Sequence, residues 1–464
     1  MNTHISRPSW GASHHLTDRV VLTLERFLHI EAVSGGVLIF AALIALLWAN
    51  SPFADAYHGF WHLDVTLGVG SLSVTQSLHF LVNEALMTVF FLVAGMEIRR
   101  ELHEGALSNI RLATLPLAAA VGGVVMPAII YLGFNGQPEV RQGWAVPIAT
   151  DIAFALGVLA LLGSAIPRGV RVLLLALAII DDIIAVLVIA LFYSHDLRLD
   201  GGVIAAIAVA IVLLFQRFGI RSALAYVLPG AVMWFGLLRL GVHPTLAGVA
   251  LGLLTPVVAL ADRSGVARYA RKLVDTMSSA REEKLDDREL ADSLRQVNSA
   301  QLDVIPPVVR VEAHLHPWVA YGVMPLFAFA NAGVTIHGAS DFAGAGSTAV
   351  ALGIGLGLLL GKPLGILLAS FIAIRMRWCE MPGDVGWKGV SLVALLGGIG
   401  FTMSIFIAML AFESAQLLAT AKLAILVASG AAAALALLLG RMLFRHQDTH
   451  VTARSQLLHE QEGG

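Results

Sequence analysis

The chain has 464 residues, of which 57% are hydrophobic and only 13% are charged. Soluble globular proteins usually carry about 25% charged residues, so this composition excludes an ordinary soluble protein and indicates a chain that uses lipid as its solvent. The formal net charge of −2 gives no reason to expect nucleic acid or another polyanion as a partner, and the single cysteine, Cys379, excludes an internal disulfide framework.

The amino-terminal residues 1–30 contain no long apolar run and do not resemble a cleavable signal peptide. Twelve apolar segments follow, each near the roughly 20 residues that span a bilayer. Their approximate ranges are 33–50, 79–98, 113–134, 144–162, 170–193, 201–215, 222–238, 244–261, 317–336, 348–374, 388–411 and 420–441. Because a spanning segment must satisfy its backbone internally, we predict an all-α multi-pass membrane protein with twelve transmembrane helices.

The basic residues predict the orientation of these helices. With the amino terminus in the cytoplasm and all twelve segments spanning, 25 of the 30 Lys and Arg residues lie on the cytoplasmic side, four lie on the opposite side, and Lys362 lies within a span. This bias predicts that both chain ends are cytoplasmic. The predicted organisation is a tail at 1–30, a membrane core at 31–261 with spans 1–8, a loop at 262–316, a core at 317–441 with spans 9–12, and a tail at 442–464.

Two of the predicted loops differ from the others. Residues 65–74 alternate between apolar and polar types around glycines, which predicts a short periplasmic β-hairpin within the loop 51–78. The cytoplasmic loop 262–316 is long and strongly charged, which is typical of a solvated helix or insert.

Asp181 and Asp182 stand in the middle of the apolar run 173–186. Ionisable side chains inside a span cost about 2.5–3.5 kcal/mol each on insertion scales and are functional hypotheses by default. Two adjacent carboxylates in a medium of low dielectric constant repel each other, and either a proton or a small cation relieves that repulsion. The pair therefore predicts a site that exchanges protons and cations. Adjacent helical positions point about 100° apart, so the two carboxylates need not contribute equally.

Two other charged residues lie within predicted spans. Asp151 and Thr150 follow Pro147, which lacks a backbone donor and opens the helix, so Asp151 can serve an ion site, cap a half-helix, or do both. Lys362 lies near the centre of the segment 348–374 and needs an acidic partner, either Asp151 or one member of the aspartate pair.

Glycines interrupt the eleventh predicted span at Gly397, Gly398 and Gly400. This break and the one at Pro147 fall in the middle segments of two three-span units, 113–193 and 348–441. Inverted repeats with paired broken helices are typical of secondary transporters, so we predict two broken helices that cross.

Six stretches closely resemble the bacterial NhaA sodium/proton antiporters. They are residues 149–157, 176–182, 241–248, 316–321, 325–333 and 398–406. The resemblance implies a secondary, electrogenic Na⁺(Li⁺)/H⁺ antiporter of the inner membrane, which exports sodium against inward protons and is activated at alkaline pH. It implies no enzymatic activity, no cofactor, and a homodimer joined through the hairpin at 51–78.

The resemblance also implies roles for individual residues. Asp181 and Asp182 form the shared sodium/proton site, and Thr150 and Asp151 lie at the crossing of the broken helices. Asp151 offsets the positive half-helix ends and Lys362 offsets the negative ones. The residues implied in pH sensing around the cytoplasmic funnel are Glu97, Arg100, Glu101, His243, Glu312 and His316.

The sequence departs from the family pattern at four places. Ala313 stands where another histidine is expected, Glu84 stands where aspartate is expected, Pro244 replaces a small residue, and the loop 262–306 is unusually long. These departures concern the pH response more than transport itself.

Three other functions fit the sequence less well. An intramembrane aspartyl protease needs Tyr-Asp and Gly-x-Gly-Asp motifs on separate spans, and neither motif is present. A sodium-coupled symporter of organic anions would not need the aspartate pair and would need more midplane basic residues than Lys362. A channel is a third alternative, but such a charged site would release ions slowly.

Overall fold

The computed structural model describes residues 33–258, except 70–71, 109, 164–165, 195–196 and 221, and residues 305–444, except 337–343 and 345. The predicted tail at 1–30, residues 445–464 of the second tail and residues 262–304 of the charged loop lie outside this part of the chain.

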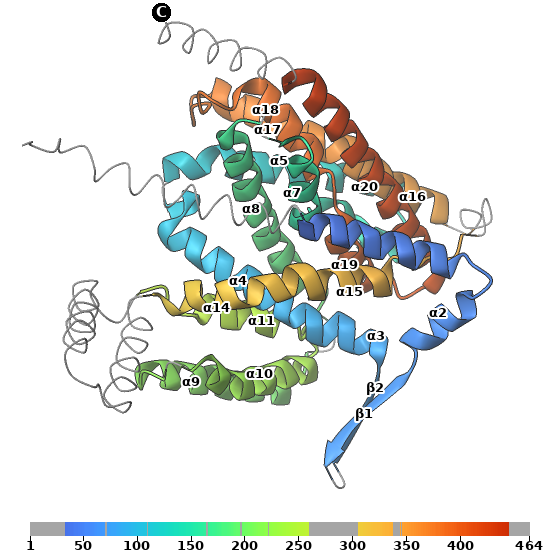
Figure 1. Cartoon of the computed structure of the whole chain (residues 1–464), viewed down its shortest axis with the longest axis vertical. Coiled ribbons are helices and arrows are strands. Elements are labelled where there is room, and N and C mark those ends of the chain that lie inside the picture. Colours follow the sequence, from blue (N-terminus) through green and yellow to red (C-terminus); the bar gives the residue numbers. More distant parts are fainter. Residues whose placement is uncertain are drawn as a thin grey trace, which may run out of the picture.

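The first half of the described chain is almost entirely helical (Figure 1). A helix at Val33–Ala49 comes first. It is followed by α2 (Ala54–Trp61), strands β1 (Asp64–Val69) and β2 (Leu72–Ser77), α3 (Leu78–Phe80), a π-helical turn (Leu81–Leu86), α4 (Met87–Glu104), α5 (Ile110–Phe134), α6 (Pro138–Arg141), a 3₁₀ segment (Gln142–Ile148), α7 (Ile152–Ala160), α8 (Arg168–Phe192), α9 (Leu199–Arg217), α10 (Val227–Leu240) and α11 (Leu246–Leu254).

The second half consists of helices and two π-helical turns. Its elements are α14 (Pro307–Trp318), a π-helical turn (Val319–Val323), α15 (Met324–Asn331), α16 (Ser347–Leu356), a π-helical turn (Gly357–Gly361), α17 (Lys362–Arg375), α18 (Gly386–Gly397), α19 (Phe401–Ala411) and α20 (Ala415–Phe444). Glu312 and His316 fall within the predicted loop 262–316, but the structure places both on helix α14.

Many of these helices have the length and composition of membrane spans. Within the described residues, seven helices qualify, and up to ten spans result if each of three bent helix pairs is counted as one. The multi-pass character predicted from the sequence is thereby confirmed. The predicted segments 244–261 and 317–336 are not among these candidates, so the number twelve stays a prediction.

The segment 51–78 contains more structure than the sequence predicts. Strands β1 and β2 pair antiparallel, with Asp64 opposite Ser77 and Val69 opposite Leu72. Helix α2, which the sequence did not predict, turns by 118° away from the helix Val33–Ala49. It is held by Tyr57, whose buried hydroxyl donates to the Phe329 carbonyl oxygen at 2.6 Å.

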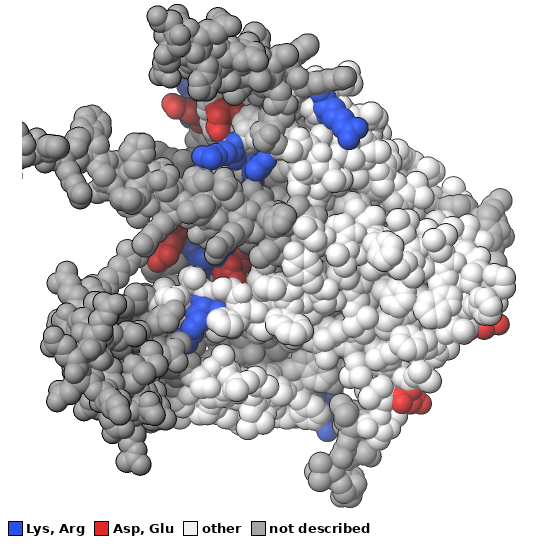
Figure 2. Space-filling view, in the orientation of Figure 1, with Lys and Arg blue, Asp and Glu red and all other residues white. Residues whose placement is uncertain are grey.

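The outer surface is apolar in the way that lipid requires. Leu191, Leu199 and Leu228 are 75%, 87% and 73% exposed, and many other large hydrophobic side chains are exposed as well. Figure 2 shows that the described charged residues on this face gather mostly along one edge and leave a broad uncharged area. An apolar surface of this extent would drive a soluble protein to aggregate, whereas hydrocarbon solvates it.

Close helix packing depends on glycine at the contact between α5 and α17. A Cβ atom built on Gly365 would lie 2.0 Å from the Gly122 carbonyl oxygen, and one built on Gly122 would lie 2.1 Å from the Gly365 oxygen. Membrane helices lack a strong hydrophobic force between them and associate through such close approach of small residues. This contact holds Lys362, in the first turn of α17, against the core.

We expect Gly365→Ala to lower the stability of the protein by roughly 1–3 kcal/mol, because the new methyl group overpacks the contact with the α5 backbone. The measurement is the thermal unfolding of the purified protein in detergent. Gly355→Ala is the matched control, since Gly355 lies in the same helical run and its Cβ position is open. An equal loss of stability in both variants would contradict the packing argument.

Candidate ion-binding site

Two broken helical segments cross inside the core. The first comprises Pro138–Ile148 and α7, with a bend of 42°, and the second comprises α18 and α19, with a bend of 43°. Their breaks, 149–151 and 398–400, touch directly, because the Asp151 amide donates to the Ile399 carbonyl oxygen at 2.7 Å. Of the residues that predicted the breaks, Pro147 lies in the 3₁₀ segment just before the first break, and Gly398 and Gly400 lie within the second.

Backbone geometry at each break follows from the local sequence. Asp151 has extended backbone angles and forms the amino-terminal cap of α7. Gly398 has no room for a side chain, since a Cβ atom would lie 2.6 Å from the Leu358 carbonyl oxygen. Glycine therefore allows the second break to approach the neighbouring helical run closely.

The Asp151 carboxylate accepts backbone amides at the amino-terminal ends of both α7 and α19. Asp151 Oδ1 accepts the Phe154 N–H of α7 at 3.0 Å, and Asp151 Oδ2 accepts the Thr402 N–H of α19 at 3.0 Å. The Thr402 hydroxyl also donates to Asp151 Oδ2. These amides carry the positive ends of the two helix dipoles, so a buried negative charge at Asp151 is stabilised from two directions. The capping role and the place in the site, left as alternatives by the sequence, coexist.

The carboxyl ends of the broken helices receive donors. The Ser404 hydroxyl donates to the Val146 oxygen at 2.8 Å, and the Lys362 ammonium donates to the Ile148 oxygen. The Thr150 hydroxyl lies 3.1 Å from the Gly397 oxygen at the end of α18. The crossing therefore places the Lys362 ammonium and the Ser404 hydroxyl where carbonyl oxygens of the first broken helix would otherwise be unsatisfied.

Lys362 pairs with Asp181. The two charged groups lie 2.8 Å apart, and both side chains are completely buried. The structure thus selects Asp181 from the acidic partners that the sequence left open. Thr150 Oγ1 lies 2.6 Å from the same oxygen, Asp181 Oδ2, and its single proton favours this charged acceptor over the Gly397 carbonyl. The other carboxylate oxygen, Asp181 Oδ1, is buried without a hydrogen-bond partner among the described residues.

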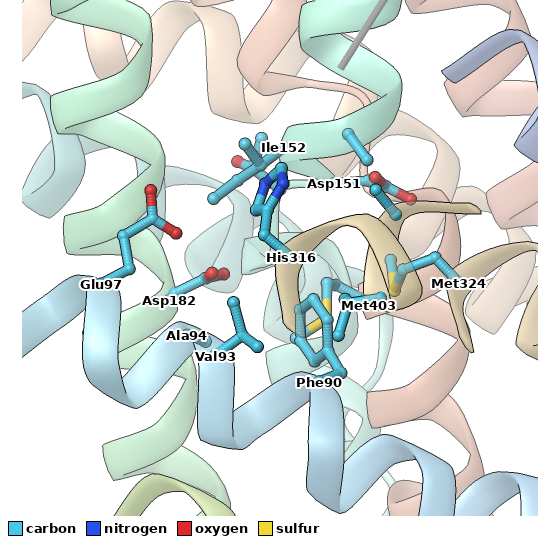
Figure 3. A pocket seen from close by; sticks show the side chains of 14 residues that line it. Phe90, Val93, Ala94, Glu97, Asp151, Ile152, Asp182, His316, Met324 and Met403 are labelled. Carbon is cyan, nitrogen blue, oxygen red and sulfur yellow. The ribbon is translucent and has the colours of Figure 1, made fainter. Parts of the chain in front are cut away.

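Asp182 occupies a different environment from its neighbour. It lines a cavity of about 60 Å³, whereas Asp181 does not. Glu97 from α4, His316 from α14 and Asp151 line the same cavity, and Figure 3 shows these side chains arriving from separate helices. A volume of this size accommodates a few water molecules or one partly hydrated cation. The two adjacent carboxylates therefore lie in different surroundings.

Within the described residues, no group of three or more His, Cys, Asp or Glu side chains forms a ready metal cage. Asp182, Asp151 and Thr150 are the lining residues of this cavity whose side chains carry carboxylate or hydroxyl oxygens nearest the crossing. Small hard cations prefer such oxygen ligands, and incomplete coordination suits a cargo that must leave again.

Five of the six residues implied in pH sensing lie on the neighbouring helices α4 and α14, and His243 lies apart. Arg100 Nη1 and Glu312 Oε1 form an ion pair at 2.6 Å that joins α4 to α14. Burial raises the pKa of the Glu312 carboxyl, against the opposing effects of Arg100 and His316. Glu97 and His316 line the cavity instead.

His243 lies apart from these residues, between α10 and α11. Its Nδ1 is 3.5 Å from Glu84 Oε2 and 3.2 Å from the Thr245 hydroxyl. Burial lowers the pKa of the imidazole to about 4, so His243 is neutral at physiological pH in this conformation. Neither His243 nor Glu101 lines the cavity.

Comparison with known proteins identifies the family of the chain. The Na⁺/H⁺ antiporter 1 family matches residues 25–439. The chain belongs to this family. It is 59% identical to the Na⁺/H⁺ antiporter NhaA of Janthinobacterium sp. (strain Marseille), over 92% of this chain and 94% of that protein. It is 56% identical to the Na⁺/H⁺ antiporter NhaA of Bordetella petrii, over 96% of each chain.

The chain is therefore a Na⁺/H⁺ antiporter, a transporter and not an enzyme. The resemblance read from its motifs is confirmed. The sequence predicted no role for three residues of the crossing: Thr402 and Ser404, which lie in the resembling stretch 398–406, and Ser429, whose hydroxyl accepts the Phe401 N–H at 3.0 Å. Small hydroxyl residues are common in membrane helices, so their type alone gave no signal.

We expect Lys362→Gln to destabilise the protein by roughly 3–5 kcal/mol, because it leaves Asp181 charged and buried without its partner. The double variant Asp181→Asn/Lys362→Gln removes both charges and should be more stable than the single variant. Thermal unfolding of wild type, both single variants and the double variant completes the cycle. Additive effects of the two substitutions would refute a direct pair.

Proposed function

We propose that this antiporter exports Na⁺ or Li⁺ electrogenically, in exchange for inward H⁺, and that it is activated at alkaline pH. One arrangement carries the proposal: Asp181 is bound by Lys362, while Asp182 faces the cavity. Asp182 is therefore accessible to an incoming ion, whereas Asp181 is occupied by Lys362.

The exchange follows from competition for these carboxylates. In the proton-loaded site Asp182 is neutral and Asp181 is paired with Lys362. A cation that enters beside Glu97 and His316 displaces the proton from Asp182. It then attracts Asp181, whose Oδ1 is unpartnered among the described residues, and weakens the bond to Lys362. Protons arriving from the other side reverse these steps. Because cation and proton occupy the same carboxylates, each excludes the other.

Charge balance supports an electrogenic cycle. A buried ammonium that loses its carboxylate partner is destabilised by several kcal/mol and sheds its proton instead. Sodium binding then releases one proton from Asp182 and another from Lys362. Two protons exchange for one sodium ion, so each cycle moves net charge across the membrane.

Alkaline activation is proposed to act through the ion pair between α4 and α14. Both helices contribute cavity-lining residues, Glu97 and His316. Since the pKa of Glu312 is raised, its proton remains bound to a higher pH than that of a free glutamate. Deprotonation as the pH rises creates the charge that pairs with Arg100 and draws the two cavity walls together.

The remaining proposals concern location and assembly. We infer an inner-membrane protein with both ends in the cytoplasm, from the 25 to 4 distribution of basic residues. We also infer a homodimer joined through the hairpin formed by β1 and β2. Membership of an antiporter family favours exchange over the sodium-coupled symport of organic anions.

We expect Asp182→Asn to abolish sodium-dependent proton movement, since an amide neither carries a proton as cargo nor neutralises a cation. Everted membrane vesicles are energised to an acidic interior, NaCl is added, and the internal pH is followed at external pH 6.5–8.5. Wild type should alkalinise the interior, and more strongly at high pH. If the cycle is electrogenic, an imposed membrane potential should change the rate of sodium-dependent proton movement. Full activity of Asp182→Asn, or a rate indifferent to the potential, would overturn the corresponding part of the proposal.

We expect Glu312→Gln to move half-maximal activity to higher pH, by roughly half to one unit. Glutamine mimics the protonated, uncharged glutamate and cannot form the charged pair with Arg100. The other titratable groups of the sensor must then lose more protons before activity is half-maximal. The same vesicle assay across pH provides the measurement. Asp200→Asn is the control, because the Arg239–Asp200 pair is 4.0 Å long and exposed. An unchanged midpoint in Glu312→Gln would exclude this residue from the pH response.

A further inference from the structure

Ser429 of α20 is a buried serine outside the cavity whose side chain reaches the crossing. It is 1% exposed. Its hydroxyl accepts the N–H of Phe401, the first residue of α19, at 3.0 Å. Helix α20 otherwise presents mainly small apolar residues to the core, so this contact is a specific polar link between α20 and the second broken helix.

The contact is one of the hydrogen bonds that satisfy the backbone amides at the amino-terminal end of α19. The Phe401 amide goes to Ser429, and the Thr402 amide goes to Asp151. Both donors are buried, and a buried amide that loses its acceptor is destabilised because no water replaces the lost hydrogen bond. Asp151 Oδ2 already accepts two donors from Thr402, so it is not a vacant substitute for the serine.

The same face of α20 also fixes the break itself. Ala432 lies one turn beyond Ser429, and a Cβ atom on Gly398 would be 3.6 Å from the Ala432 Cβ. Gly398 is bounded on another side by the Leu358 carbonyl oxygen. Helix α20 thus packs against the break 398–400, and the Ser429 hydroxyl is its hydrogen-bonded contact with the start of α19.

We propose that Ser429 is a positioning residue for the antiport reaction. Its neutral hydroxyl accepts the Phe401 amide. The Asp151 carboxylate therefore accepts only the Thr402 donors at α19 and the Phe154 amide at the cap of α7. The position of Asp151 also fixes its neighbour Thr150, which bonds Asp181. Ser429 therefore sets the carboxylates at the spacing that a cation requires, without touching the cation. This inference rests on the proposed transport site.

Loss of the hydroxyl should weaken cation binding more than turnover. In Ser429→Ala the Phe401 amide competes for Asp151 and moves it relative to Asp181. We expect the apparent KM for Na⁺ and Li⁺ to rise roughly 3- to 10-fold, as for substitutions that act on a site through a network, with Vmax changed less than two-fold. Ser429→Thr retains the hydroxyl and should restore the KM.

The test uses the full-length protein in everted vesicles, with expression and thermal unfolding recorded for each variant. Ser370→Ala is the matched control, because Ser370 is completely buried on α17 and its hydroxyl has no hydrogen-bond partner among the described residues. If Ser429→Ala does not accumulate, Ser429→Cys provides the same comparison with a much weaker acceptor.

Two results would overturn the inference: a KM of Ser429→Ala or Ser429→Cys within two-fold of wild type, or an equal rise in Ser370→Ala. Inactive wild-type vesicles would instead count against the proposed transport cycle, so the two failures are distinguishable.

Discussion

Broken helices inside a bilayer need partners for every exposed backbone group, and this requirement organises the centre of the molecule. Each break leaves N–H groups on one side and carbonyl groups on the other, in surroundings without bulk water. Asp151 accepts amides from both α7 and α19, and Lys362 donates to a carbonyl oxygen of the first break. Asp151 and Lys362, two of the charges in the proposed ion site, are therefore also the charges that satisfy the backbone at the crossing. Under the proposed mechanism, removing either one would affect structure and transport together.

The pairing of Lys362 with Asp181 has a further consequence. A buried pair is only marginally stabilising, because desolvation of two charges opposes their attraction. Such a pair is easily displaced by a competitor with a full positive charge. Asp182, at the adjacent position of α8, lines the cavity, so in the proposed cycle it is the first of the two to meet an entering cation. The approximately 100° between neighbouring helical positions gives the two carboxylates different surroundings, although they are adjacent in sequence.

The sequence picks out the buried charges and the helix breaks of the crossing, but not the contacts between them. Charges at Asp151, Asp182 and Lys362 stand out because charged residues are costly in apolar segments, and the breaks stand out because proline and glycine mark them. The partner of Lys362 could not be predicted, since it depends on how α17 packs against α8. Ser429 gave no signal either, because its contact with Phe401 joins residues 28 positions apart through tertiary packing. Helix α2 was missed for a similar reason: it is short, and Tyr57 anchors it to the distant Phe329.

In the proposed mechanism, the ion pair between Arg100 and Glu312 regulates the site without coordinating the cargo. Neither residue lines the cavity, yet their helices contribute Glu97 and His316 to its wall. A change in that pair can alter the width of the cavity or the electrostatic potential within it, while Asp181 and Asp182 keep their local contacts. The site can thus retain its affinity for the cargo while access to it varies with pH. His243 fits a different role, because burial keeps its imidazole neutral and Glu84 and Thr245 hold it in place. Its influence on a pH profile would come from packing and hydrogen bonding near the site and not from its own titration.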